Sequence, residues 1–107
     1  MPIIVGTMRY PSHQQLEVVK KWIKIRDKYP ADDAMAVQLC APVITDENGI
    51  IVMGIYEVKE GQLEKAFRFY SSFLYEFIDI EGYEYTARVW STFAEALAIA
   101  GIEVPEE

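Results

Sequence analysis

The chain has 107 residues, of which 51% are hydrophobic and 25% charged, and its formal net charge is −7. This length suits one domain over residues 1–107, and the composition excludes a disordered chain. The acidic balance argues against nucleic acid as a partner, because phosphate backbones are bound by clustered Lys and Arg. No apolar run approaches the roughly 20 residues that cross a bilayer, so we expect no membrane partner.

Cys40 is the single cysteine, so no disulfide can form within the chain. The N-terminal residues lack the charged and apolar regions of a signal peptide. Both observations favour a reducing, cytoplasmic setting. Because Cys40 falls mid-strand among apolar residues, we expect a buried and unreactive thiol.

The first predicted elements are a strand and a helix. Residues Ile3–Tyr10 alternate in polarity as a strand does. Ser12 followed by Gln15 resembles a capping box, which opens a helix that ends near Tyr29, before a proline. The helix carries a wide apolar stripe made of Leu16, Val18, Val19, Trp22, Ile23 and Ile25.

A hairpin follows. Residues 34–44 are predicted as a second strand, and Pro42 favours an edge position for it. Residues 46–49 form a turn, and the third strand spans Ile50–Val58. That strand is apolar on both faces, with Ile50, Val52, Tyr56 and Val58 on one side and Ile51, Met53 and Ile55 on the other. We expect two helices to cover one face and a second molecule to cover the other.

The last third predicts a helix, a strand and a short helix. The first of these begins at residues 60–62 and places on one face Leu63, Ala66, Phe67, Tyr70, Leu74, Phe77 and Ile78. The fourth strand spans Tyr83–Trp90. Thr92 with Glu95 is a second capping box, and Gly101 ends the helix that it opens.

A weak internal repeat relates the two halves of the chain. One constant shift lays residues 5–10 on residues 53–58, so that Gly6 meets Gly54. Two βαβ units related in this way predict an α+β, ferredoxin-like βαββαβ sandwich with a four-stranded antiparallel sheet and a short C-terminal helix. The repeat places the first and third strands in the centre, parallel to each other, with Arg9 and Glu57 at the same end.

This order of elements, with Gly54–Val58, the aromatic helix and Gly82–Tyr85, resembles the dimeric α+β barrel superfamily and its uncharacterised small members. The resemblance implies a homodimer built from two facing sheets, with a ligand in a cleft between sheet and helices. Members include cofactor-free monooxygenases, muconolactone isomerases and stress-responsive barrels, so the fold alone fixes no function. Haem-binding relatives place a histidine on a helix beside the cofactor, whereas His13 falls in the first turn of the first helix.

Two interpretations stay open for Gly6 and Gly54. As a pair of missing side chains they could floor a pocket, walled by Met8, Tyr10, Tyr56, Phe67 and Tyr70. Alternatively, they let a helix approach the sheet closely or mark a bulge.

The candidate ligand-binding residues are Tyr10, Tyr56 and Arg88. Arg88 would hold an anion if its side chain faces inward; otherwise it reaches water, as charged strand residues usually do. His13 is a candidate general base, because its unperturbed pKa of about 6.5 suits proton transfer. Its alternative is an exposed residue on a helix's first turn.

Two functional hypotheses follow. The first is a small-molecule site, either a binder or a cofactor-free enzyme acting on a small aromatic or enolisable compound. The second is a non-catalytic dimerisation or partner-docking module. It would use Phe69 and Phe73, because the aromatic residues of this helix are more than one helical face can hold. No His/Cys cluster, phosphate loop or nucleophile elbow is present in the sequence, and we expect neither a metal nor a cofactor.

Overall fold

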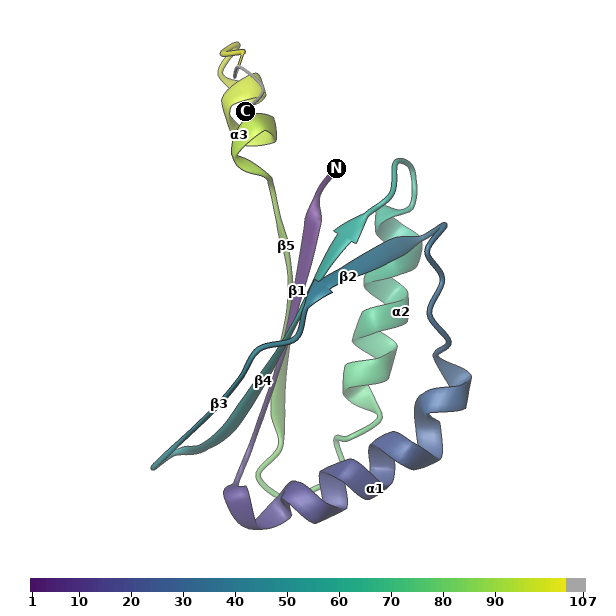
Figure 1. Cartoon of the computed structure of the whole chain (residues 1–107), viewed down its shortest axis with the longest axis vertical. Helices are drawn as coiled ribbons and strands as arrows, with labels where there is room; N and C mark the ends of the chain where they lie inside the picture. Colours follow the sequence, from purple (N-terminus) through teal and green to yellow (C-terminus); the bar gives the residue numbers. More distant parts are fainter. Residues whose placement is uncertain (104–107) are drawn as a thin grey trace.

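Two strands, β1 (Ile3–Tyr10) and β4 (Gly49–Val58), lie side by side in the centre of an antiparallel sheet (Figure 1). On one side β4 pairs with both β2 (Ala36–Cys40) and β3 (Val43–Asp46). On the other side β1 pairs with β5 (Glu84–Trp90). Residues 1–103 therefore form a mixed structure of helices and an open sheet of five strands, in the order β2-β4-β1-β5 with β3 beside β4.

The computed structural model describes residues 1–103, and this part contains three α-helices. They are α1 (Gln15–Ile25), α2 (Leu63–Tyr75) and α3 (Phe93–Ile99). α1 and α2 lie on one side of the sheet, and the other side carries no helix in the described part (Figure 1). None of these helices has the length and apolar character needed to cross a bilayer.

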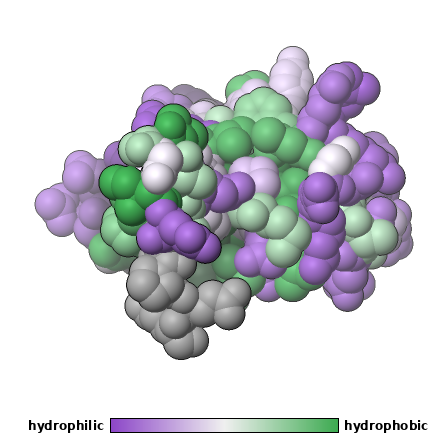
Figure 2. Space-filling model, turned by 90° about the horizontal axis from the view of Figure 1, so that it is seen from above, coloured by the Kyte–Doolittle hydropathy of each residue, from purple (hydrophilic) through white to green (hydrophobic). Residues whose placement is uncertain are grey.

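α3 projects beyond the end of β5 and covers neither face of the sheet (Figure 1). The molecule is accordingly elongated, measuring 48 × 31 × 20 Å. A view from the end that α3 occupies shows hydrophobic residues at the surface among hydrophilic ones (Figure 2). Phe93 and Ile99 of α3 are both highly exposed, and the helix contains no buried residue.

The core between sheet and helices is divided into two clusters. One contains Met8, Tyr10, Val18, Ile25, Ile50, Leu74, Phe77 and Tyr83. The other contains Ile4, Met35, Ala36, Val58 and Ala66. Along β1 and β4 the boundary between them falls at Gly6 and Gly54, which are direct cross-strand partners, as the internal repeat predicted. The faces of β4 are also confirmed, since its even-numbered residues face the helices with Gly6 and Met8.

The central strands run antiparallel, and the parallel arrangement expected from the repeat is wrong. Ile3 lies opposite Glu57 and Arg9 opposite Ile51, so Arg9 and Glu57 are at opposite ends of the strand pair. Arg9 lies opposite Glu84 of β5 instead. The two halves are related by a rotation, which keeps the glycines together and exchanges the strand ends.

The expected second strand is interrupted, which is why the sheet has five strands and not four. The register of β2 on β4 shifts between Gln38 and Cys40, and Pro42 separates β2 from β3. The Pro42 carbonyl still accepts a hydrogen bond of 2.9 Å from the Met53 N–H. Cys40 lies at this break on the sheet edge and is exposed, so the prediction of a buried thiol is wrong.

The two predicted capping boxes have different outcomes. Ser12 makes no side-chain cap; it begins a short 3-10 helix (Ser12–Gln14) for which Pro11 is the N-cap. At α3 the capping box is confirmed. The Thr92 hydroxyl accepts from the Glu95 N–H at 3.1 Å, and the Glu95 carboxylate accepts from the Thr92 N–H at 2.8 Å.

α1 contributes less to the core than its apolar stripe predicted. Of the stripe, Val18 and Ile25 are buried. The remaining members are exposed, namely Leu16, Val19, Trp22 and Ile23. The reason is the position of α1, which lies across the end of α2 and does not run along the sheet (Figure 1).

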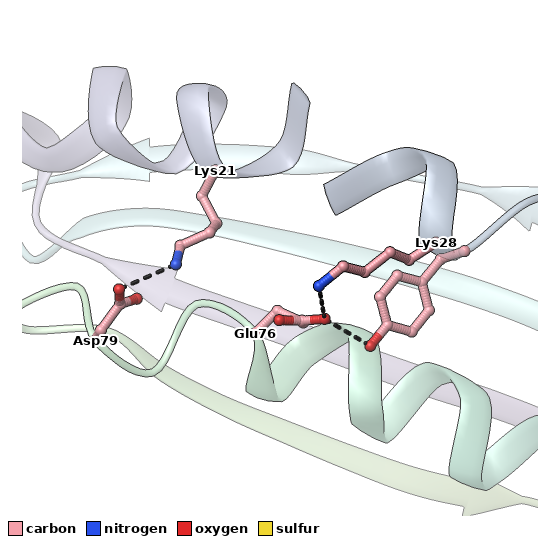
Figure 3. Close-up of polar contacts among 5 residues, drawn as sticks. Lys21, Lys28, Glu76 and Asp79 are labelled. Atoms are coloured by element: carbon pink, nitrogen blue, oxygen red, sulfur yellow. Dashed lines mark hydrogen bonds and ion pairs between the residues drawn. The ribbon is translucent and has the colours of Figure 1, made fainter. Parts of the chain in front are cut away.

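Polar contacts join α1 and its C-terminal extension to the end of α2. The Lys21 ammonium lies 3.0 Å from the Asp79 carboxylate, and Lys28 lies 3.6 Å from Glu76 (Figure 3). Glu76 also accepts a hydrogen bond of 2.9 Å from the Tyr29 hydroxyl. These contacts position Tyr29, the residue at which the chain turns back toward β2.

Candidate small-molecule cleft

A cavity of about 570 Å³ lies between the sheet, α2 and the segment that follows α1. Gly6 and Gly54 lie on its sheet side, at the boundary between the two core clusters. Six aromatic residues line it, namely Trp22, Tyr29, Tyr56, Phe69, Tyr70 and Phe73. A volume of several hundred Å³ with mostly apolar walls is typical of small-molecule sites.

Both glycines line the cleft, and at Gly6 the missing side chain also lets α2 approach the sheet closely. A Cβ atom at Gly54 would lie 2.7 Å from the Tyr56 hydroxyl oxygen and 2.8 Å from its ring. The hydroxyl end of the Tyr56 ring therefore occupies the space beside Gly54 that a side chain would need. At Gly6 a Cβ atom would lie 3.1 Å from the Leu74 side chain, where α2 approaches the sheet.

The aromatic rings form a connected series around the cleft. Tyr56 and Tyr70 are stacked, with centroids 3.8 Å apart and an interplanar angle of 19°. Tyr70 meets Phe69 edge to face at 5.2 Å. Tyr29 meets Phe69 and Phe73 edge to face at 5.3 Å and 5.5 Å. Such contacts restrict each ring, so the walls of the cleft are largely preformed.

The phenols of the cleft remain protonated at neutral pH. Burial raises the pKa of Tyr56 above its usual 10.0. Burial raises the pKa of Tyr70 to about 12, and the charges of Tyr56, Asp32 and Asp33 add to the effect. Each hydroxyl can therefore donate or accept a hydrogen bond, but neither supplies a phenolate base near pH 7.

Two carboxylates lie at the rim of the cleft, on the segment that leads into β2. Asp32 and Asp33 are the charged residues among its described lining. One Asp32 oxygen accepts a hydrogen bond of 3.1 Å from the Ala34 N–H, and the other lies 3.9 Å from Lys65. The rim is therefore acidic, and one of its two carboxylates also holds the local turn.

The structure does not bring the four predicted site residues together. Tyr56 lines the cleft. Tyr10 is buried within a core cluster and is not among the lining residues. His13 is exposed in the 3-10 helix before α1, and Arg88 is exposed on β5, on the sheet face opposite the helices.

Sequence reasoning missed most of the wall that comes from the first half of the chain. Trp22 and Tyr29 are seven residues apart, the spacing that puts side chains on one face of a helix. The sequence also suggests Phe69 and Phe73 as surplus aromatics for a partner protein. In the structure they pack against Tyr29 and line the cleft.

No family model, curated protein or solved structure matches this chain. Within residues 1–103, no group of three or more His, Cys, Asp or Glu side chains lies close enough together to hold a metal ion.

Proposed function

We propose that this protein binds a small aromatic compound in the cleft without a cofactor. The observation that carries the proposal is the interrupted core: at Gly6 and Gly54 the two clusters part, and six aromatic residues surround the space. Close-packed interiors rarely leave voids larger than a water molecule. A cavity of about 570 Å³ with stacked and edge-to-face walls favours a planar, apolar guest.

The proposal is one of binding and not of proton transfer. Tyr56 and Tyr70 have raised pKa values, so they act as neutral hydrogen-bonding groups. His13, the candidate base for an enolisable substrate, does not line the cleft. The polar groups available to a guest are the phenols, the Gln38 amide and the rim carboxylates.

A fluorescence titration tests the proposal. The chain has two tryptophans, Trp22 in the cleft and Trp90 on the opposite sheet face. In a Trp90→Phe background, Trp22 reports on the cleft alone. We expect 2-phenylethanol to change its emission saturably, and to raise the melting temperature as a ligand of the native state does.

A matched pair of variants localises the binding. Gln38→Phe places a ring at an exposed position of the lining and should abolish the titration. Leu39→Phe makes the same addition to the neighbouring exposed residue, which does not line the cleft, and should leave it intact. Equal binding by both variants, or no saturable response to any aromatic probe, would contradict the proposal.

A second proposal concerns the sheet face opposite the helices. We propose that two copies associate through it as a homodimer, in a ferredoxin-like arrangement of the dimeric α+β barrel type. The support is an apolar centre formed by Val5, Ile51, Met53 and Ile55, none of which a helix of the described chain covers. If β2 and β3 count as one interrupted strand, the sheet order also matches that fold.

Charge on this face suits contact between identical copies. On β1, β4 and β5 the face carries Arg9 and Arg88 together with Glu57 and Glu84. The charges balance, so the same patch can meet itself across a two-fold axis, as an isologous interface requires.

A further inference from the structure

The charges that face the cleft are all of one sign. Asp32 and Asp33 are its charged lining residues within the described chain, and the same lining contains no Lys, Arg or His. Lys65 approaches Asp32 at 3.9 Å through a largely exposed side chain. Within residues 1–103 Asp33 takes part in no ion pair. A guest entering the cleft therefore meets a net negative rim.

The aromatic walls, like the acidic rim, favour a positively charged guest. The face of an aromatic ring is negative, and it attracts a cation placed above it. The chain already shows such a contact beside the cleft, where the guanidinium of Arg26, a residue outside the lining, lies 5.4 Å from the centre of the Trp22 ring. The influence of the rim also extends inward, because Asp32 and Asp33 both contribute to the raised pKa of Tyr70.

We infer that the cleft selects organic cations, in which a protonated amine or quaternary ammonium is attached to an aromatic ring. The inference rests on the proposed function, since it names the ligand class of the same cleft. The ring of such a guest would lie among the aromatic walls, and its ammonium would lie at the rim beside Asp33. An anion of the same size would meet two carboxylates at the rim.

Three probes of similar size separate charge from aromatic character: 2-phenylethylamine, 2-phenylethanol and phenylacetate. We expect the amine to bind about fivefold more tightly than the alcohol, and phenylacetate to bind most weakly. Asp33→Asn and the double variant Asp32→Asn/Asp33→Asn should weaken the amine more than the alcohol and so remove most of the preference for the amine. The amide oxygen introduced at residue 32 can still accept from the Ala34 N–H, so the turn is retained. Asp27→Asn, an exposed carboxylate outside the lining, is the matched control.

The salt dependence of binding to the unsubstituted protein gives a second test, which does not depend on whether the variants fold. Raising the salt from about 10 mM to about 0.5 M should weaken the amine and leave the alcohol unchanged, because salt screens a charge at an exposed rim. If the alcohol binds as tightly as the amine, or if neither salt nor the Asn variants change the amine affinity, the inference is overturned while the proposed function stands. If none of the three probes binds, both are overturned.

Discussion

Gly54 shows how one residue can set the shape of a site. Its missing Cβ leaves the space in which the Tyr56 ring lies, and that position lets Tyr56 stack on Tyr70 at 3.8 Å. A side chain at residue 54 would lift the ring and change the wall of the cleft. The same substitution gains β propensity, because glycine is unfavourable within a strand.

Gly54→Ala is therefore expected to reduce the free energy of unfolding by about 1–3 kcal/mol, the usual range for overpacking. In a Tyr56→Ala background the ring is absent, and the substitution should become neutral or slightly stabilising. Urea denaturation of the four proteins in this double-mutant cycle measures the coupling. Equal costs in the two backgrounds would show that the ring does not occupy the space over Gly54.

Phe77 and Phe93 compare one side chain in two environments. Phe77 is 0% exposed and packs between Phe73 and Tyr83, whereas Phe93 is 74% exposed on α3. Phe77→Ala should cost about 3–5 kcal/mol of unfolding free energy, since the cavity would lie in the core. Phe93→Ala should cost less than about 0.5 kcal/mol. Chemical denaturation checks both, and a comparable loss at Phe93 would mean that α3 is covered in solution.

Among the elements, α3 depends most on local interactions. It buries no residue, and it is held by its capping box and by an ion pair of 3.2 Å between the Met1 ammonium and the Glu95 carboxylate. Thr92→Ala should remove about 1 kcal/mol from the stability of this helix, and Thr92→Ser should retain it. The Cα chemical shifts of Ala96 and Ala98 report the helix directly. Unchanged shifts in Thr92→Ala would show that another contact holds α3.

The same capping box predicts a pH dependence for α3. The hydrogen bond from the Thr92 N–H to its carboxylate lowers the pKa of Glu95 below its ordinary 4.5. A carboxyl with a lowered folded pKa adds stability above the unfolded value and loses it as the pH falls through the folded value. The helical shifts of Ala96 and Ala98 should therefore decline below about pH 4.5, and Glu95→Gln should remove this transition.

At this scale the sequence predicted the elements better than their relations. Strand alternation and the Thr92 box are local signals, and β1, the hairpin turn and α3 follow from them. The repeat correctly placed Gly6 beside Gly54, but a shift in sequence cannot distinguish a translation from a rotation. The direction of β4 was therefore predicted wrongly. The burial of α1 depends on its angle to α2, which no local pattern specifies.

The sequence predicted only the part of the cleft that depends on local strand pattern. Its sheet side follows from Gly6, Gly54 and Tyr56. Gly54 and Tyr56 are two residues apart on one strand and therefore lie on the same face of the sheet. Asp32 and Asp33 come from the segment between α1 and β2. The position of that segment depends on where α1 ends, so its contribution to the rim needed the structure.

At the scale of the whole molecule, the proposed homodimer can be tested by measuring the mass of the protein in solution. We expect sedimentation velocity to show a dimer at micromolar concentration. Ile55→Lys puts a charge in the apolar centre of the open sheet face and should yield a folded monomer, because an unpaired charge in an interface is costly. Leu16→Lys adds the same charge to an exposed apolar residue of α1 and should leave the dimer intact.

A stable monomer of the unsubstituted protein, or dissociation by both lysine variants alike, would rule out this interface. The measurement is independent of the cleft, since neither Ile55 nor Leu16 is among its lining residues.

The break at Pro42 leaves the two margins of the sheet unequal. Along β2 and β3 the row of backbone N–H and C=O groups that faces away from the sheet is interrupted. A register shift and Pro42, which has no N–H, cause the interruption. Along β5 the corresponding row runs unbroken from Glu84 to Trp90. An incoming extended chain, such as a fibril end or an unfolded neighbour, thus has one continuous template on this protein, and growth by strand addition would start there.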